Sequence, residues 1–405
     1  LGGRLSPFNS LLTDNRSPRG SIAAAVAARK DRMSMYVPTQ EAMVQVCLRA
    51  NQNVHLWGND GEGKSEWLKA LVVGGFRWGL GIQILSMSDP VDIKGIPVMK
   101  DGELVFMPGR IYREACEYGD KGIPFVIFSD EKNTAAPSTR AACLNAETAR
   151  EVADTKLPDG TRFMSAANPP EVAVNGTDEQ PPECTRKTHV DWSLDFGTWA
   201  EGMLNDFAPP TVLPCPDDWE DRIPAMRAFI VGYLQKDNSA FREEPGPKFL
   251  NKPRAVPRSW TNLANLFACG ESMGVSDDVL LHLAQGTVGK GASKNLWEYW
   301  MLRDLVDIDE ALSSPDTIQL PERADVRYLF ATSLAAEVCR RGSLDAWNSS
   351  WILLDRAVQD GWKSIAALSA RTIAREVGNI PKAAKNIPTV AQDFMPMLRA
   401  IQGLK

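Results

Sequence analysis

The chain has 405 residues, with 45 lysines and arginines against 51 aspartates and glutamates, and 44% of its residues are hydrophobic. This length and composition predict a water-soluble globular protein of about two to three domains. The formal net charge of −6 argues against an electrostatic grip of the whole protein on DNA or RNA, although a local basic stripe would not show in a net charge.

The sequence contains no candidate for a membrane span or a secretion signal. No window approaches the roughly 18 consecutive apolar residues of a transmembrane helix, and the first residues lack the apolar core of a signal peptide. The seven cysteines are widely scattered and form no zinc-type spacing. We therefore expect a cytoplasmic protein whose cysteines are reduced thiols of the core.

The first half of the chain alternates strand and helix patterns after an arm or linker at 1–35. Asp-Gly between two apolar runs is a strong hairpin signal, because glycine suits the left-handed turn. Strands that alternate with helices predict an α/β fold with a parallel sheet over 36–213. The predicted elements are a helix at 40–49, a strand at 54–57, a helix at 65–73, strands at 82–85, 124–128 and 163–167, and a hairpin of 96–99 with 104–106.

The second half of the chain is predicted to be helical. Glycines that follow periodic apolar runs mark helix ends, and Gly342, Gly361 and Gly378 have such positions. We expect a helical lid at 214–290 and a C-terminal helical region at 291–405. The helices are predicted at 219–234, 259–273, 276–284 and 295–305, with three more ending near these glycines; Trp297, Trp300, Trp347, Trp351 and Trp362 are expected to pack in their core.

The most informative motif is G-x-x-x-x-G-K-[ST], placed between an apolar strand and a helix. Its glycines let the backbone wrap closely around phosphates, so that N–H groups and the helix N-terminus face the negative charge. Lys64 would contact the β- and γ-phosphates, and Ser65 would ligate Mg²⁺. The predicted nucleotide-binding residues are Gly58, Asn59, Asp60, Gly61, Glu62, Gly63, Lys64, Ser65 and Glu66.

Acidic residues end the next fully apolar strand, 125–129. Asp130 is placed to hold the Mg²⁺ shell, and Glu131 to polarise an attacking water. Alone, such a pair is often only a solvated strand-to-helix turn. After a phosphate-binding loop, it predicts a Walker B motif.

Three further polar residues are candidates for the same site. Asn168 follows the strand 163–167 and could hydrogen-bond the γ-phosphate or the water, whereas Arg186 and Arg258 are weaker candidates, since most arginines are solvated surface groups. The segment 286–291 also contains glycines and a lysine, but it lacks a Ser or Thr after the lysine and an apolar strand before it. We interpret it as a loop that ends a helix.

Together these residues resemble the MoxR group of AAA+ ATPases, in the helix-2-insert branch of P-loop enzymes. The similarity rests on the P-loop, on 88–95 followed by the hairpin, on 130–133, and on Asn168 within Ala-Asn-Pro-Pro-Glu. It implies a P-loop AAA+ αβα sandwich with a parallel sheet, an α-helical lid and a C-terminal helical region. It also implies a helix-2 insert at 88–107 and a pre-sensor hairpin at 151–163.

The resemblance assigns roles to the polar residues. Asn168 matches sensor 1, Arg186 matches the arginine finger that reaches the neighbouring subunit's nucleotide, and Arg258 matches sensor 2. An aromatic residue usually follows the finger arginine, but Lys187 stands here, so either Arg186 or Lys187 could complete the neighbour's site.

We expect a ring-forming ATP hydrolase that uses ATP and Mg²⁺, typically as a hexamer, to remodel or assemble a protein client. The resemblance also implies a separate von Willebrand A-type partner. One alternative is a DNA- or RNA-translocating motor that uses Lys94, Lys156 and Arg162 as a pore stripe. Another is a non-enzymatic nucleotide switch, which an intact Glu131 disfavours.

Overall fold

The computed structural model describes residues 37–173 and 176–375. The arm predicted at 1–35 and the helix end predicted at Gly378 lie outside these residues.

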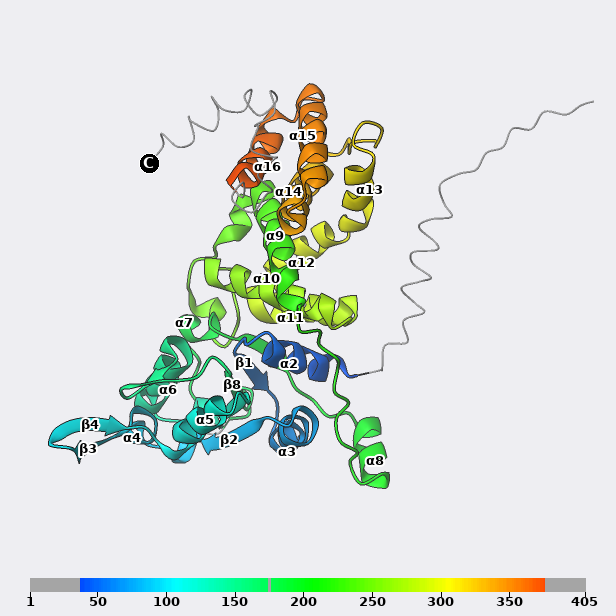
Figure 1. The fold of residues 1–405 in the computed structure, drawn as a ribbon. Helices are drawn as coiled ribbons and strands as arrows, with labels where there is room; N and C mark the ends of the chain where they lie inside the picture. The colour runs from blue at the N-terminus through cyan, green and yellow to red at the C-terminus, as the bar shows by residue number, and fades with distance from the viewer. Residues whose placement is uncertain (1–36, 174–175, 376–405) are drawn as a thin grey trace, which may run out of the picture. The chain divides into compact units, whose positions relative to one another are not determined.

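A five-stranded parallel sheet forms the centre of the first half of the chain (Figure 1). Its spatial order is β2-β5-β8-β1-β9, so the first strand lies between the last two and the second lies at the far edge. This confirms the predicted α/β fold. The strands are β1 (Val54–Trp57), β2 (Gly79–Ile84), β5 (Phe125–Asp130), β8 (Thr161–Ala167) and β9 (Thr188–Asp191).

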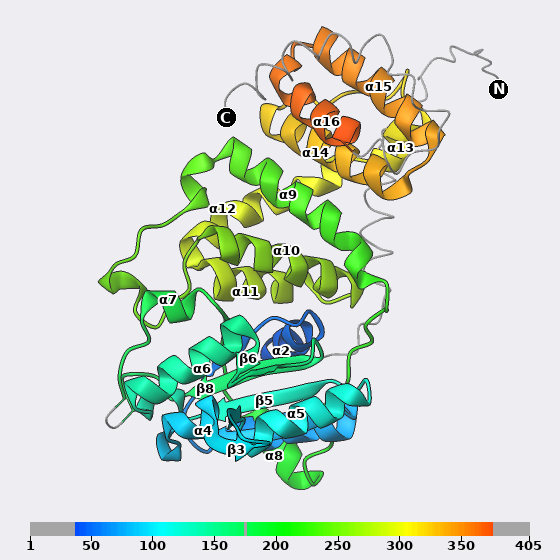
Figure 2. The same ribbon diagram turned by 60° about the vertical axis from the view of Figure 1, so that its left-hand side comes forward.

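Helices cover both faces of this sheet (Figure 2). Alternate residues of β5 point to opposite faces, as strand geometry requires. Val126 and Phe128 belong to the apolar cluster that contains α2 and α3, whereas Phe125 and Ile127 belong to the cluster that contains α5 and α6. The covering helices are α2 (Thr39–Arg49), α3 (Lys64–Lys69), α5 (Arg110–Asp120) and α6 (Pro137–Ala149).

Two antiparallel hairpins extend this layer. In the first, β3 (Ile96–Lys100) pairs with β4 (Glu103–Met107) through Asp101 and Gly102, whose φ angles are 52° and 86°, which confirms the predicted Asp-Gly turn. The second pairs β6 (Glu151–Val152) with β7 (Thr155–Lys156). The first hairpin exposes much apolar surface, as Met99 is 70% and Leu104 is 62% exposed.

Several elements differ from the predicted bounds, among them α12, which spans Lys290–Trp300 where a helix at 295–305 was predicted. β2 begins at Gly79, three residues earlier than predicted, and a Cβ at Gly79 would lie 2.3 Å from the Phe125 ring. Glycine therefore lets two neighbouring strands pack where a side chain would clash. The helix predicted at 65–73 is α3 followed by a π-helix, η1 (Ala70–Phe76).

Several elements were not predicted from the sequence. Among them, α8 follows the last strand of the sheet, and none of its residues is buried. Phe196 is 78% and Leu204 is 86% exposed, although both are strongly apolar. The helix α8 spans Phe196–Leu204. The other elements without a predicted counterpart are β9, α5, α6, α4 (Pro90–Lys94), α7 (Pro181–Cys184), α13 (Ile308–Ser313) and the 3₁₀ turns η2 (Leu85–Met87), η3 (Lys132–Thr134), η5 (Asn238–Phe241) and η6 (Pro247–Phe249).

The next four long helices pack on the sheet layer through one shared apolar core. A Cβ at Gly286 would lie 2.1 Å from the carbonyl oxygen of His189, so α11 lies directly against β9. The Thr287 and Thr188 hydroxyls, 3.0 Å apart, add a buried polar contact between the same elements. These helices, preceded by η4 (Trp219–Arg222), are α9 (Ile223–Lys236), α10 (Pro257–Ser272), α11 (Asp277–Val288) and α12 (Lys290–Trp300).

The last described helices have an apolar core of their own. Buried Trp347, Trp351 and Trp362 lie in it, which agrees with their expected packing role. Gly342 caps α14, and Gly361 follows the end of α15, with φ angles of 57° and 85°. After η7 (Arg303–Leu305), the helices of this region are α13, α14 (Ala324–Arg341), α15 (Leu344–Gln359) and α16 (Lys363–Arg375).

The described residues contain neither a disulfide nor a candidate membrane-spanning helix. All seven cysteines lie in the described residues, and none of them forms a disulfide there. Within residues 37–173 and 176–375, no helix combines the length and the apolar character that crossing a bilayer requires.

Candidate nucleotide-binding site

The glycine-rich loop lies between β1 and α3, at the carboxyl edge of the sheet. Gly61 and Gly63 have φ angles of 77° and 73°, a conformation that favours glycine. Gly58 lies so close to the backbone just after β9 that a Cβ there would be 2.7 Å from the carbonyl oxygen of Trp192. Each of these three glycines therefore has a conformational or steric reason to be glycine.

The loop is held in shape by its own residues. The Glu62 carboxylate accepts hydrogen bonds from the Asn59 backbone N–H and side-chain amide, both at 3.2 Å. The Trp192 indole N–H donates to the Glu62 carbonyl oxygen at 3.1 Å. Glu62 therefore stabilises the loop from within, whereas Asp60 and Glu66 are exposed.

Lys64, the first residue of α3, is buried and bends back over the loop. Its ammonium group donates to the carbonyl oxygens of Gly58 and Asn59, at 2.7 Å and 2.6 Å. Burial lowers the pKa of Lys64, and the charges of Asp130 and Glu62 partly offset this shift. A buried cation thus lies at the centre of a loop of suitable size for phosphate.

Ser65 brings the loop and the acid pair together. Its hydroxyl donates to Asp130 Oδ2 at 2.8 Å, across a separation of 65 residues in the sequence. Asp130 is the last residue of β5 and is half-buried. A hydroxyl and a carboxylate are both hard oxygen donors, which is the ligand type that Mg²⁺ takes, so this pair fits such an ion.

Glu131 follows directly and has an unusual backbone. Its φ of 54° and ψ of 40° are left-handed, a conformation that is strained for a residue other than glycine and that concentrates at functional sites. Its backbone N–H donates to Asp130 Oδ1 at 2.9 Å, and its exposed carboxylate accepts a hydrogen bond from the Ser86 hydroxyl. Ser86, just after β2, was not a candidate from the sequence.

Asn168 lies at the end of β8, between the loop and the acid pair. The Gly58 N–H donates to the Ala167 carbonyl oxygen at 3.2 Å, and the Asn133 side-chain amide donates to the Asn168 carbonyl oxygen at 2.9 Å. Asn168 is half-buried. Its backbone is thus tied to both neighbouring segments.

The two candidate arginines share a different neighbourhood. Burial and the like charge of Arg258 lower the pKa of Arg186, whose guanidinium donates to the Pro182 carbonyl oxygen. Arg258 is exposed on the first turn of α10. In the described part of the chain, no hydrogen bond or ion pair joins either arginine to the glycine-rich loop, Asp130 or Glu131.

Lys187 does not share the surface position expected for it. It is only 3% exposed and forms an ion pair with Glu179, which is fully buried. A lysine held in this way has no access to a neighbouring subunit. Of the two cations weighed for that role, Arg186 alone keeps access to solvent.

A cavity of about 1070 Å³ lies next to the loop. Its walls include Trp57 and Gly58 on one side and His282 and Lys290 of the helical region on the other. The size is at the upper end for a small-molecule site, about 300–1,000 Å³. The cavity therefore has room for a nucleotide.

The segment 286–291 forms part of this wall. As expected, it ends a helix: α11 stops at Val288, Gly289 has a φ of 90°, and α12 begins at Lys290. Its place in the cavity was not predicted, because it follows from the packing of α11 on β9, which no local pattern encodes.

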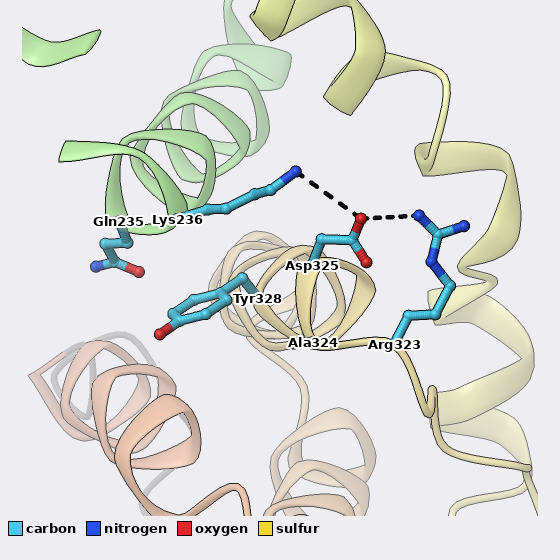
Figure 3. Close-up of a pocket in the computed structure, with 6 residues that line it drawn as sticks. All are labelled: Gln235, Lys236, Arg323, Ala324, Asp325 and Tyr328. Carbon is cyan, nitrogen blue, oxygen red and sulfur yellow. Dashed lines mark hydrogen bonds and ion pairs between the residues drawn. The ribbon is translucent and has the colours of Figure 1, made fainter. Parts of the chain in front are cut away.

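A second cavity, of about 440 Å³, lies between the end of α9 and the start of α14 (Figure 3). Asp325 separates the two cations of this cavity: its carboxylate lies 3.8 Å from the Lys236 ammonium and accepts a hydrogen bond from Arg323 at 2.8 Å. Both cations face a carboxylate already, so the cavity does not resemble an anion site.

One buried trio, Glu179, Cys184 and His189, has the spacing of a metal site. The Trp57 indole donates to His189 Nδ1 at 2.9 Å, and His189 Nε2 lies 3.0 Å from the Cys184 carbonyl oxygen. Because both ring nitrogens are occupied, the trio does not fit a metal ion.

Comparisons with known proteins found similarity to solved structures. No protein-family model matches the chain, and no curated protein matches its sequence. Among solved structures, the chain is similar to a "putative ATPase" from Cytophaga hutchinsonii, with 14% identity and a TM-score of 0.39, over 67% of this chain and 86% of that one.

Proposed function

We propose that the chain is an ATP-hydrolysing member of the MoxR-like AAA+ proteins, and that it works as a ring, typically a hexamer. The observation that carries this proposal is the 2.8 Å contact between Ser65 Oγ and Asp130 Oδ2, beside a glycine-rich loop that surrounds Lys64. Two separate sequence motifs meet there in the arrangement that triphosphate binding requires.

The loop residues would hold the phosphates, with Lys64 moving from the loop carbonyls to the β- and γ-phosphate oxygens. Ser65 and Asp130 would hold Mg²⁺, which, when bound, neutralises charge on the phosphates. The large cavity next to the loop gives room for the nucleoside. Because residues of the helical lid, 214–290, line this cavity, closure of the lid would cover the nucleoside.

Glu131 is the proposed general base. It directly follows Asp130, the proposed Mg²⁺ ligand, and the Ser86 hydroxyl orients its carboxylate. From there it would orient a water molecule for attack on the γ-phosphate and accept its proton. Asn168, at the neighbouring strand end, would fix the same water or the γ-phosphate.

Arg186 is the proposed arginine finger for the neighbouring subunit, and Arg258 the sensor of its own nucleotide. Arg186 keeps access to solvent, which a role in trans requires. Such fingers accelerate hydrolysis by about 10³–10⁵-fold. Hydrolysis would therefore depend on assembly of the ring.

The proposed client is a protein, which a separate von Willebrand A-type partner would help to present. The β3–β4 hairpin supports a protein client, because it exposes apolar side chains such as Met99 and Leu104 rather than a row of cations. Arg162 does not support the nucleic-acid alternative, because its guanidinium already donates to the carbonyl oxygens of Leu48 and Asp159, both at 2.8 Å.

The test is ATP turnover by the purified protein at several concentrations. We expect turnover that rises more steeply than protein concentration, is lost in Lys64→Ala and Glu131→Gln, and is kept in the surface controls Lys69→Ala and Glu117→Gln. Glu131→Gln should still bind ATP.

Three results would contradict the proposal. Equal turnover per chain by a dilute monomer would exclude the role of Arg186 in trans. Nucleotide binding without any turnover would favour the switch. Strong stimulation by single-stranded DNA or RNA, weakened by salt, would favour the nucleic-acid motor.

A further inference from the structure

A group of charged and imidazole side chains is buried beneath the candidate site. Their exposed fractions are 7% or less, and acids and lysines are almost never buried this deeply unless they are paired. We call this group the Glu179 cluster. Its members are His55, Lys132, Glu147, Glu179, Lys187 and His189.

The charges in the cluster balance. Lys187 forms an ion pair with Glu179, and the Lys132 ammonium lies 2.7 Å from Glu147 Oε1. Burial lowers the pKa of His55 well below its usual range and the pKa of His189 to about 4, so both histidines are neutral near pH 7. Two cations therefore face two anions.

Glu179 is central among these charges. Its Oε1 lies 3.9 Å from His55 Nε2 and contacts the Lys187 ammonium. Burial would raise the pKa of Glu179, but the positive charges of Lys187 and Lys132 hold this pKa well below its usual range. The carboxylate is thus the anion that several segments share.

The positions of these partners in the sequence connect them to the site. Lys132 directly follows Glu131, Lys187 directly follows Arg186, and His55 lies in β1, which leads into the glycine-rich loop. His55 Nδ1 also lies 2.7 Å from Ser165 Oγ. Ser165 belongs to β8, the strand that Asn168 follows. Glu179 thus contacts Lys187 and His55 directly, and it also attracts the charge of Lys132, whose own ion pair is with Glu147.

The backbone of Glu179 is joined to the wall of the large cavity. Its N–H donates to Asn251 Oδ1 at 2.7 Å, and the Asn251 N–H donates to its carbonyl oxygen at 3.1 Å. Asn251 and Asp178, which are hydrogen-bonded to each other at 2.7 Å, both line that cavity. A change in the cavity wall can therefore reach Glu179 through its main chain.

We propose that Glu179 is a positioning residue that holds the catalytic loop of its own subunit and the Arg186 segment in one rigid unit. The inference rests on the proposed function, because it assumes that Glu131 and Arg186 serve different nucleotides. If this inference holds, Glu179 couples ATP hydrolysis in one subunit's site to the position of the arginine that the same subunit supplies to its neighbour's site.

The test uses mixed rings, in which the two roles are carried by different chains. An Arg186→Ala chain keeps its catalytic loop, and a Glu131→Gln chain keeps its arginine, so the mixture has active sites only where the two chains meet. Glu179→Gln is then added to one chain or to the other. The readout is kcat relative to the reference mixture, with KM measured alongside.

We expect kcat to fall by about 10- to 100-fold in both arrangements, with little change in KM, because a small misplacement of a catalytic group costs that much. A fall in only one arrangement, or in neither, would overturn the coupling. An inactive reference mixture would instead overturn the proposed function, and with it this inference.

A second variant separates positioning from folding. Glu179→Gln together with Lys187→Met removes both charges of the pair, so no unpaired charge is left in the interior. We expect this double variant to regain the melting temperature of the parent while kcat stays low in both arrangements. Recovery of kcat together with stability would mean that Glu179 only supports the fold.

Discussion

Ser86→Ala should slow ATP hydrolysis without weakening nucleotide binding. The Ser86 hydroxyl donates to the Glu131 carboxylate, and Glu131 has a strained left-handed backbone with a φ of 54°. Three other hydrogen bonds hold the backbone of this residue: its N–H donates to Asp130 Oδ1 at 2.9 Å, and its carbonyl oxygen accepts from the Thr134 hydroxyl at 2.9 Å and from the Thr134 N–H at 3.2 Å. Within residues 37–173 and 176–375, the bond from Ser86 is the one that fixes the carboxylate itself.

The size of the effect follows from that single hydrogen bond. A hydrogen bond to a charged group contributes about 1.5–3 kcal/mol, and an exposed one contributes at the lower end. About 1.4 kcal/mol corresponds to a tenfold change in rate. We therefore expect kcat to fall by about tenfold while KM for ATP stays within about twofold.

Steady-state ATPase assays of the parent and four variants test this reasoning. Ser88→Ala is the matched control, because its hydroxyl lies in the same segment but donates to the Ile84 carbonyl oxygen at 2.8 Å. Adding Ser86→Ala to Glu131→Gln should change little, since the two residues act through one contact. An unchanged or faster Ser86→Ala enzyme, or a full additional loss in the double variant, would refute the assignment.

Three further predictions follow from the same structure. Gly58→Ala should weaken ATP binding in calorimetry while the circular dichroism spectrum stays unchanged, because the new Cβ would lie 2.7 Å from the Trp192 carbonyl oxygen; unchanged affinity would contradict the loop geometry. Burial lowers the pKa of Lys64 below its usual 10.5, so ATP affinity should fall with rising pH before 10.5 is reached, and Lys64→Ala should lack this limb. Gly286→Ala should destabilise the protein by about 1–3 kcal/mol in denaturant unfolding, since α11 must move away from His189, and an unchanged midpoint would count against that packing.

The core of the site could be predicted because its signals are local. The glycine-rich loop is one continuous motif, and an apolar strand that ends in Asp130 and Glu131 is another. Parallel strands place their carboxyl ends at one edge of the sheet, so the meeting of Ser65 and Asp130 follows from the fold class. The Asp-Gly hairpin was also predictable, because its turn signal is local in the sequence.

The parts that were missed depend on contacts between distant segments. Nothing near Lys187 in the sequence shows that its partner will be Glu179, and so its burial could not be predicted. Ser86 reaches Glu131 only because β2 and β5 are neighbours in the sheet. The exposed apolar helix α8 contradicts the usual rule that such residues are buried, and its pattern resembles that of a buried segment.

The most direct test of the central claim is a double-mutant cycle on the contact between Ser65 and Asp130, measured as the Mg²⁺ dependence of ATP affinity by calorimetry. If the two side chains hold one ion, Ser65→Ala and Asp130→Asn should each lower the Mg²⁺-dependent affinity by about tenfold or more, and the double variant should be little worse than either. Unchanged Mg²⁺ dependence in Asp130→Asn, or independent additive losses, would contradict a metal shared between the loop and the strand end.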